Sequence, residues 1–94
     1  MTRVRWTRQA VEDVEAIKVY VARDSERYAT LLVERLVAAV GRLESFPQSG
    51  CVVPEVGDNS LREVIDGSYR LVYRLHAESI EVVTVYHAAR LLRV

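Results

Sequence analysis

The sequence contains only one cysteine, Cys51, so no disulfide can form within the chain. A chain without disulfides is typical of a reducing compartment, and we expect the cytoplasm. Long hydrophobic runs are also missing: the longest, such as LVAAV and VVTVY, are far shorter than the ~20 residues that cross a bilayer. The amino-terminal stretch MTRVRWTRQ lacks the apolar centre of a signal peptide, which agrees with that expectation.

An excess of charge of one sign is absent too, since 13 Lys and Arg residues balance 13 Asp and Glu residues. This balance argues against a protein that holds nucleic acid mainly through its phosphates. Lysine is nearly missing, because all the basic residues except Lys18 are arginines. Arginine favours planar contacts with carboxylates and phosphates, but a GC-rich genome would give the same bias, so composition leaves both explanations open.

Two further kinds of motif are missing. No cluster of Cys and His suggests a metal site, and no glycine-rich turn between a strand and a helix suggests a nucleotide. We therefore expect no metal and no cofactor. The length of 94 residues predicts a single domain over residues 1–94.

The first half of the sequence predicts a strand followed by two helices. RVRW, at residues 3–6, alternates charged and apolar residues as a short strand does, and Thr7 offers an N-cap for a helix to about Arg23. Asp24 and Ser25 then break this helix and cap a second one, from about residue 26 to residue 44, which FPQSG ends. The short link between them predicts an antiparallel helical hairpin.

The second half of the sequence changes to the alternation of strands. CVVPEV contains Pro54, which places it at an edge or at a strand end, and LREVI, YRLVYRLH and IEVVTVYH follow as strands. The predicted fold class is α+β, in the order β-α-α-β-β-β-β, with the helical hairpin packed on one face of a small, mostly antiparallel sheet. The other face has no segment left to cover it, so we expect a ligand or partner there.

Alternation along YRLVYRL separates two sets of side chains. Tyr69 and Tyr73, with Tyr86 of the last strand, are expected on the helix-covered face. A tight turn at residues 77–78 would place Arg74 opposite Glu81 as a surface ion pair, and Arg70 opposite Val85. Arg70 would then lie unpaired near His87 on the uncovered face.

Three further residues could join Arg70 and His87: Arg62, Glu55 and Arg90. The face of Arg62 depends on the DGS turn. A three-residue turn places it on the Arg70 face, and a two-residue turn places it opposite.

The order of elements, together with FPQSG…VPEV, LREVIDGSYRLVYRL and VYHAAR, resembles the RelE/ParE superfamily of bacterial type II toxins over essentially the whole chain. The long helical hairpin and the H-x-x-R ending are more similar to the ParE branch. The resemblance implies a toxin that inhibits DNA gyrase by binding and is stored as a hetero-oligomer with a ParD-like antitoxin. It implies antitoxin contacts at Tyr20, Tyr28, Leu32 and Leu36, and target contacts at Arg62, Arg70, His87, Arg90 and Arg93.

The same resemblance implies an alternative, a RelE-like ribosome-dependent endoribonuclease. Metal-free RNA cleavage needs a base, a cation for the phosphorane and an acid, for which Glu55, Arg70 and His87 fall at matching places. Against this, Ala88 follows the histidine where a tyrosine or a basic residue is frequent. CVVPEVGDNS also carries two acids and no base to hold ribosomal RNA. Of the two activities that the resemblance implies, non-enzymatic inhibition of gyrase is therefore the one we expect.

Overall fold

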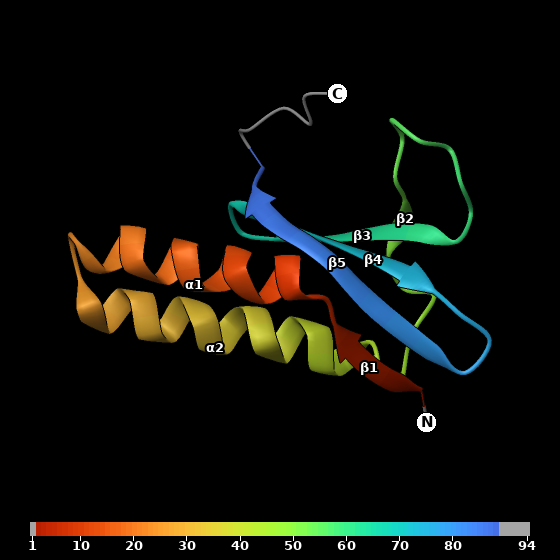
Figure 1. Ribbon diagram of the computed structural model, residues 1–94, viewed down its shortest axis with the longest axis horizontal. Coiled ribbons are helices and arrows are strands. Elements are labelled where there is room, and N and C mark those ends of the chain that lie inside the picture. The colour runs from red at the N-terminus through yellow and green to blue at the C-terminus, as the bar shows by residue number, and fades with distance from the viewer. Residues whose placement is uncertain (1, 89–94) are drawn as a thin grey trace.

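The computed structural model describes residues 2–88, in which two helices pack on a five-stranded sheet (Figure 1). This confirms the predicted α+β fold and the predicted order of the elements. Their bounds are β1 Arg3–Trp6, α1 Arg8–Ala22, α2 Glu26–Arg42, β2 Cys51–Val52, β3 Leu61–Asp66, β4 Tyr69–Leu75 and β5 Ser79–His87.

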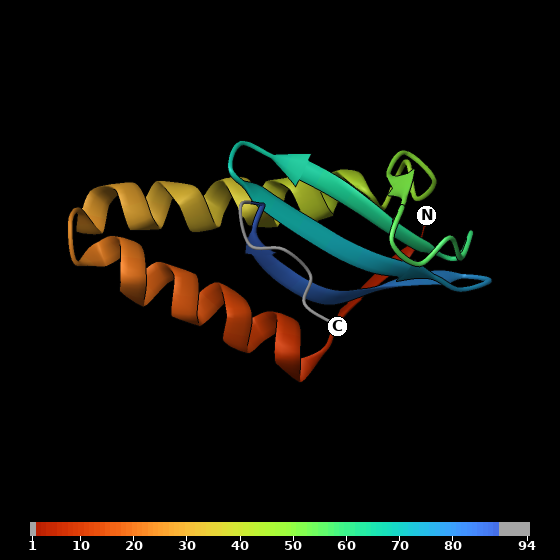
Figure 2. The ribbon, with the colours of Figure 1, turned by 90° about the horizontal axis from the view of Figure 1, so that it is seen from above.

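Both helices begin at the caps that the sequence predicts. The Thr7 hydroxyl accepts a hydrogen bond from the Ala10 amide at 3.0 Å, and the Ser25 hydroxyl accepts one from the Tyr28 amide at 3.1 Å. Because only residues 23–25 join the helices, α1 and α2 run antiparallel, and their shared end projects beyond the sheet (Figures 1 and 2). No helix within residues 2–88 is long and apolar enough to cross a membrane.

The strands lie in the order β1-β5-β4-β3-β2, with β1 parallel to β5 and every other pair antiparallel. The two-residue strand β2 forms one edge, as the nearby Pro54 predicts. One face of the sheet packs on the helices through a core that includes Leu32, Leu36, Leu71, Tyr73, Ile80 and Val82. Within residues 2–88 no helix covers the opposite face, the uncovered face, which carries Arg70, Val72 and Arg74 (Figure 1).

A β-bulge corrects the predicted register of β4 and β5. Arg74 does pair with Glu81, as predicted, but the register shifts between Val72 and Tyr73. Arg70 therefore lies opposite Tyr86 rather than Val85, and Tyr69 lies opposite His87. Because β5 contains one extra residue, every β5 side chain after the bulge points to the face opposite to the predicted one. Tyr86 therefore lies on the uncovered face, and His87 lies on the helix-covered face.

The turn between β3 and β4 decides the face of Arg62. It contains two residues, Gly67 and Ser68, and Gly67 has the positive φ of 59° that glycine adopts easily. Arg62 consequently pairs with Tyr73, away from the Arg70 face, and Glu63 pairs with Val72.

Candidate functional site on the uncovered face

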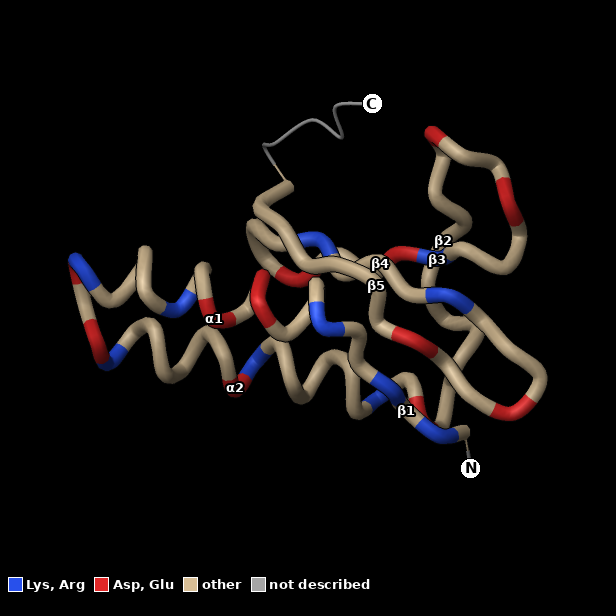
Figure 3. The backbone as a smooth tube through the Cα atoms, in the orientation of Figure 1, with Lys and Arg blue, Asp and Glu red and all other residues tan. Residues whose placement is uncertain are grey.

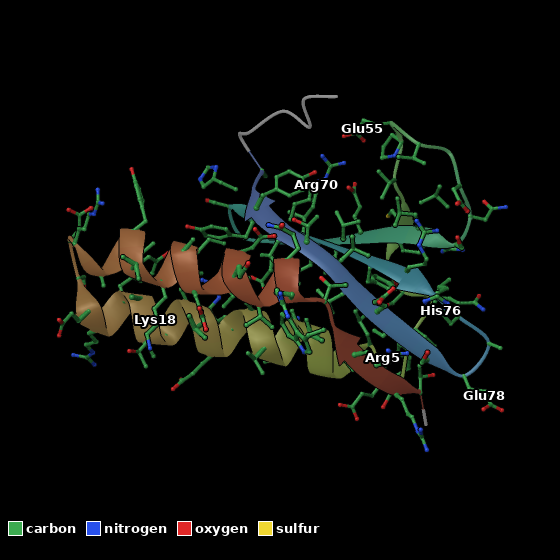
Figure 4. All side chains as sticks on the ribbon, viewed as in Figure 1. Arg5, Lys18, Glu55, Arg70, His76 and Glu78 are labelled. Carbon is green, nitrogen blue, oxygen red and sulfur yellow. The ribbon has the colours of Figure 1, made fainter. Side chains whose placement is uncertain are left out.

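Arg70 lies at the centre of an ionic cluster on the uncovered face. Its Nε donates to Glu63 Oε2, while Nη1 and Nη2 donate to Glu55 Oε2 and Oε1 at 3.0 and 2.9 Å. Figure 4 shows Glu55 and Arg70 close together on the side of the sheet away from the helices. The expectation that Arg70 is unpaired is therefore wrong, whereas its association with Glu55 is confirmed.

Three segments of the chain supply the charged side chains of the cluster. β4 supplies Arg70, β3 supplies Glu63, and the β2–β3 loop (residues 53–60) supplies Glu55. The side chains of Arg70 and Glu63 are 13% and 9% exposed, but that of Glu55 is 38% exposed. The two carboxylates thus differ in their access to water.

The electrostatics of the cluster favour the charged forms. The hydrogen bonds to Glu55 and then to Glu63 raise the pKa of Arg70 further above its ordinary value. Hydrogen bonds from Arg70 and from its own backbone amide lower the pKa of Glu55. Arg70 is therefore a permanently charged group whose positive charge is already matched by two carboxylates.

Tyr86 completes the cluster from β5. The guanidinium carbon of Arg70 lies 5.7 Å from the centre of the Tyr86 ring, within the range of a cation–π contact. Burial raises the pKa of Tyr86, and its buried hydroxyl has no hydrogen-bond partner among the residues that the structure describes. The sequence reasoning placed Tyr86 on the wrong face because alternation alone cannot reveal a bulge.

Glu63 is the residue of this cluster that the sequence reasoning missed. Its signal was present in the Asp-Gly turn, because a two-residue turn places Glu63 opposite Val72 and therefore on the face of Arg70. It is the one charged side chain among the buried residues of the described chain.

His87 lies apart from Arg70. Its ring meets Tyr69 edge to face, with the ring centres 5.3 Å apart, on the opposite face of the sheet. It also lines a cavity of about 460 Å³ between α1 and the end of β5, together with residues that include Asp13, Tyr20 and Tyr86. The predicted grouping of Arg70 with His87 is therefore wrong.

The guanidinium of Arg62 donates its hydrogen bonds to backbone carbonyls. It donates from Nε to Asn59 O at 2.9 Å, and from Nη1 to Gly50 O at 3.1 Å and Gln48 O at 3.4 Å. These bonds fasten two loops to the edge of the sheet, so Arg62 does not join the cluster around Arg70. Arg90 and Arg93, the other basic residues predicted to contact a target, lie outside the described residues.

Arg74 has a different partner from the one predicted. It contacts Asp58 at 3.4 Å and the Ser60 hydroxyl at 3.1 Å, while Glu81 lies 3.4 Å from His76. The pKa of Asp58 is lowered, first by the Ser60 amide and hydroxyl and then by Arg74. Arg74 and Glu81 are cross-strand neighbours, as predicted. The predicted ion pair between them is wrong, because Arg74 pairs with Asp58 and Glu81 pairs with His76.

The residues predicted to contact an antitoxin fall into two groups. Tyr20 and Tyr28 are 64% and 50% exposed near the projecting end of the helical hairpin. Leu32 and Leu36 are 2% and 0% exposed because they face the sheet within the core, so they cannot contact a partner in this fold. This corrects the prediction for the two leucines and leaves it open for the two tyrosines.

The cluster brings ionic side chains and the ring of Tyr86 together on one face of the sheet. Within residues 2–88, no group of three or more His, Cys, Asp or Glu side chains is placed to hold a metal ion. Charges of both signs alternate over the sheet and the helices (Figure 3), in keeping with the net charge of zero. Such a surface gives a polyanion little general attraction.

Comparisons with known proteins extend over nearly the whole chain. A family model described as "ParE toxin of type II toxin-antitoxin system, parDE" matches residues 4–92. Y4kP of Sinorhizobium fredii, a candidate toxin, is 34% identical over 89 residues, which cover 92% of this chain and 88% of Y4kP. Toxin RelE2 of Caulobacter vibrioides is 32% identical over 92 residues, which cover 97% of this chain and 100% of RelE2.

Two solved structures share the fold. One is the chromosomal ParDE system from P. aeruginosa, with a TM-score of 0.73 and 22% identity over 93% of this chain and 96% of that one. The other is the toxin–antitoxin complex RelBE2 from Mycobacterium tuberculosis, with a TM-score of 0.63 and 24% identity over 92% of this chain and 96% of that one.

Proposed function

The chain belongs to the ParE family of toxins from type II toxin–antitoxin systems, and from this membership we propose that it inhibits DNA gyrase by binding, without catalysis. A ParD-like antitoxin is the partner that would neutralise it. Because gyrase acts on the chromosome, this target implies that the protein works in the cytoplasm.

The observation that best supports a non-enzymatic toxin is the separation of the three residues that a ribonuclease would need. A base, a cation and an acid must reach one phosphate together. Arg70 and Glu55 lie on the uncovered face, but His87 meets Tyr69 on the other face.

Two further features disfavour RNA cleavage at Arg70. The lowered pKa of Glu55 makes its carboxylate a weak base for removing a 2′-hydroxyl proton. Glu55 and Glu63 already accept from three nitrogens of Arg70, so a phosphate would have to compete with two carboxylates. The alternative of a ribosome-dependent endoribonuclease is therefore the weaker one.

The antitoxin partner is supported by the surface of the helical hairpin. Val19, Tyr20 and Tyr28 are 65%, 64% and 50% exposed on the part of the hairpin that projects beyond the sheet. Both similar structures are of toxin–antitoxin systems. An amphipathic segment of an antitoxin would gain free energy by burying these side chains.

The test measures supercoiling by purified gyrase in the presence of this protein at micromolar concentration. We expect supercoiling to fall and cleaved DNA to accumulate, and addition of the antitoxin to reverse both effects. A translation-coupled mRNA cleavage assay runs beside it. Cleaved mRNA with unaffected gyrase would overturn the proposal in favour of the ribonuclease.

A further inference from the structure

The two carboxylates that contact Arg70 are not equivalent. Glu63 comes from the interior of β3, is nearly buried, and accepts from Nε at the side of the guanidinium. Glu55 comes from the β2–β3 loop, is 38% exposed, and accepts from Nη1 and Nη2 at the end of the guanidinium. Glu63 is therefore placed to orient Arg70, whereas Glu55 occupies the end that faces outward.

The end occupied by Glu55 is the one that binds carboxylates most specifically. Two parallel N–H···O bonds from Nη1 and Nη2 match the two oxygens of a carboxylate, which is why arginine is common where planar anions are recognised. The distances of 3.0 and 2.9 Å show that Glu55 uses this fork in full. A carboxylate from another molecule would make the same two bonds if Glu55 moved away.

The surroundings of Arg70 suit a protein partner. Ile65, opposite Arg70 in the β3–β4 ladder, is 61% exposed, and Val56, next to Glu55 in the loop, is 54% exposed. Beneath the guanidinium lies the ring of Tyr86. An oriented arginine among exposed apolar side chains is the composition found at the energetic centres of protein interfaces.

We propose that Glu55 covers a carboxylate-binding site at Arg70, and that an Asp or Glu side chain of the protein target replaces it on binding. The inference rests on the proposed function only in taking the target to be a protein. A nucleic acid is disfavoured because Glu63 stays beside Arg70, and Asp58 and Glu81 lie near Arg74 along the same face. Glu55 thus lowers affinity for the target until a competing carboxylate displaces it.

The first experiment tests the site without gyrase. The variant Glu55→Gln keeps the shape of the side chain but removes its charge, and we expect it to fold normally because Glu55 is 38% exposed on a loop. We expect acetate to shift the Nε–H signal of Arg70 in an ¹H–¹⁵N NMR spectrum of Glu55→Gln, with at least a several-fold smaller shift in the unmodified protein. Asp58→Asn is the matched control, since it removes a charge from the same loop but leaves Arg70 covered.

Two outcomes of this experiment would overturn the inference. Acetate shifts that are equal in the unmodified protein and in Glu55→Gln would show that Glu55 covers nothing. A single-stranded RNA oligonucleotide forms the second arm. If it shifts the Arg70 signal of Glu55→Gln at far lower concentration than acetate does, the site is one for phosphates and not for a protein carboxylate.

The second experiment measures gyrase inhibition by the same variants. Removing an ion pair that is partly exposed changes an equilibrium by up to about fivefold, so Glu55→Gln should inhibit at a concentration several-fold lower than the unmodified protein. Arg70→Lys should require a higher concentration, because lysine lacks the fork. Weaker inhibition by Glu55→Gln would overturn the inference, since Glu55 would then itself contact the target. If no variant inhibits gyrase, the proposed function fails, while the acetate experiment still decides the inference.

Discussion

At the scale of single residues, the fold depends on the close packing around Gly50. Its amide donates to the Tyr73 hydroxyl at 3.0 Å, and that hydroxyl donates to Pro47 O at 2.7 Å. The buried tyrosine thus joins the loop after α2 to the centre of the sheet. A Cβ on Gly50 would lie 2.6 Å from the Tyr73 hydroxyl and 2.7 Å from the backbone oxygen of Glu63.

Gly50→Ala is therefore expected to destabilise the protein by about 1–3 kcal/mol, the usual cost of overpacking a well-filled site. The free energy of unfolding in urea measures this change. Gly41→Ala is the matched control, because a Cβ at this helical position meets nothing within 4 Å. It should stabilise the protein by about 0.5–1 kcal/mol through helix propensity. Equal effects of the two substitutions would contradict the packing argument.

Arg70 and Glu63 give a second prediction at this scale. Arg70→Met should lower the free energy of unfolding by about 3 kcal/mol, because it leaves the nearly buried Glu63 without its partner. The double variant Arg70→Met, Glu63→Gln should recover part of this loss, since no charge then remains buried. A double variant less stable than Arg70→Met would show that Glu63 has another role.

Glu55 gives a third prediction, which concerns acid. Its pKa in the folded protein lies below the ordinary value of 4.5, so its ion pair stabilises the fold above that pH. The stabilisation is lost as the pH falls from 4.5 through the lowered pKa. Glu55→Gln should therefore lose less stability than the unmodified protein over this interval, as thermal unfolding at a series of pH values would measure. Parallel curves for the two proteins would contradict the pairing with Arg70.

At the scale of elements, side chains at the start of α1 form hydrogen bonds with the part of β5 that no strand within residues 2–88 pairs with on that edge. β1 pairs with β5 only as far as Val82. Beyond that point the Thr7 hydroxyl donates to Val83 O at 2.9 Å, and Asp13 Oδ2 accepts from the Val85 amide at 3.0 Å and the Thr84 hydroxyl at 2.5 Å. The first two turns of α1 therefore satisfy the edge of β5 that β1 leaves open.

Asp13→Ala should cost about 2 kcal/mol of stability, because it leaves the Val85 amide and the Thr84 hydroxyl without their acceptor. Asp13→Asn should cost less, since its amide oxygen can still accept from Val85. Hydrogen exchange of the Val85 amide is the most direct measurement. An unchanged exchange rate in Asp13→Ala would show that the bond contributes little.

Elements that depend on local patterns could be predicted from the sequence. The caps at Thr7 and Ser25 fix both helix starts, and Pro54 correctly indicates a weak edge strand. The β-bulge depends instead on how β4 and β5 fit across the sheet, and no periodicity in either strand reveals it. This one shift separates His87 from Arg70, which is why the predicted elements are correct while the predicted grouping of these two residues is not.

At the scale of the whole molecule, the residues that build the core are separate from the residues that we propose to bind partners. The helices use one side for the core, where Leu32 and Leu36 are buried, and leave Tyr20 and Tyr28 exposed at the projecting end of the hairpin. The ionic cluster around Arg70 lies on the opposite side of the sheet from the helices (Figure 4). The molecule therefore offers two separate surfaces, and an antitoxin on the hairpin could leave the cluster exposed.

This separation predicts different outcomes for substitutions within α1 and α2. The double variant Tyr20→Ser, Tyr28→Ser should keep the stability of the unmodified protein within about 0.5 kcal/mol, because both rings are largely exposed. It should bind the antitoxin at least about tenfold more weakly, since aromatic anchors commonly dominate such interfaces. Leu36→Ala should instead cost about 2–5 kcal/mol of stability. At temperatures where Leu36→Ala remains folded, its antitoxin affinity should be unchanged, because Leu36 is 0% exposed. Calorimetric titration with the antitoxin measures its affinity for each variant, and urea unfolding measures the free energy of unfolding.

Tight antitoxin binding by the double variant Tyr20→Ser, Tyr28→Ser would show that the antitoxin binds elsewhere on the molecule.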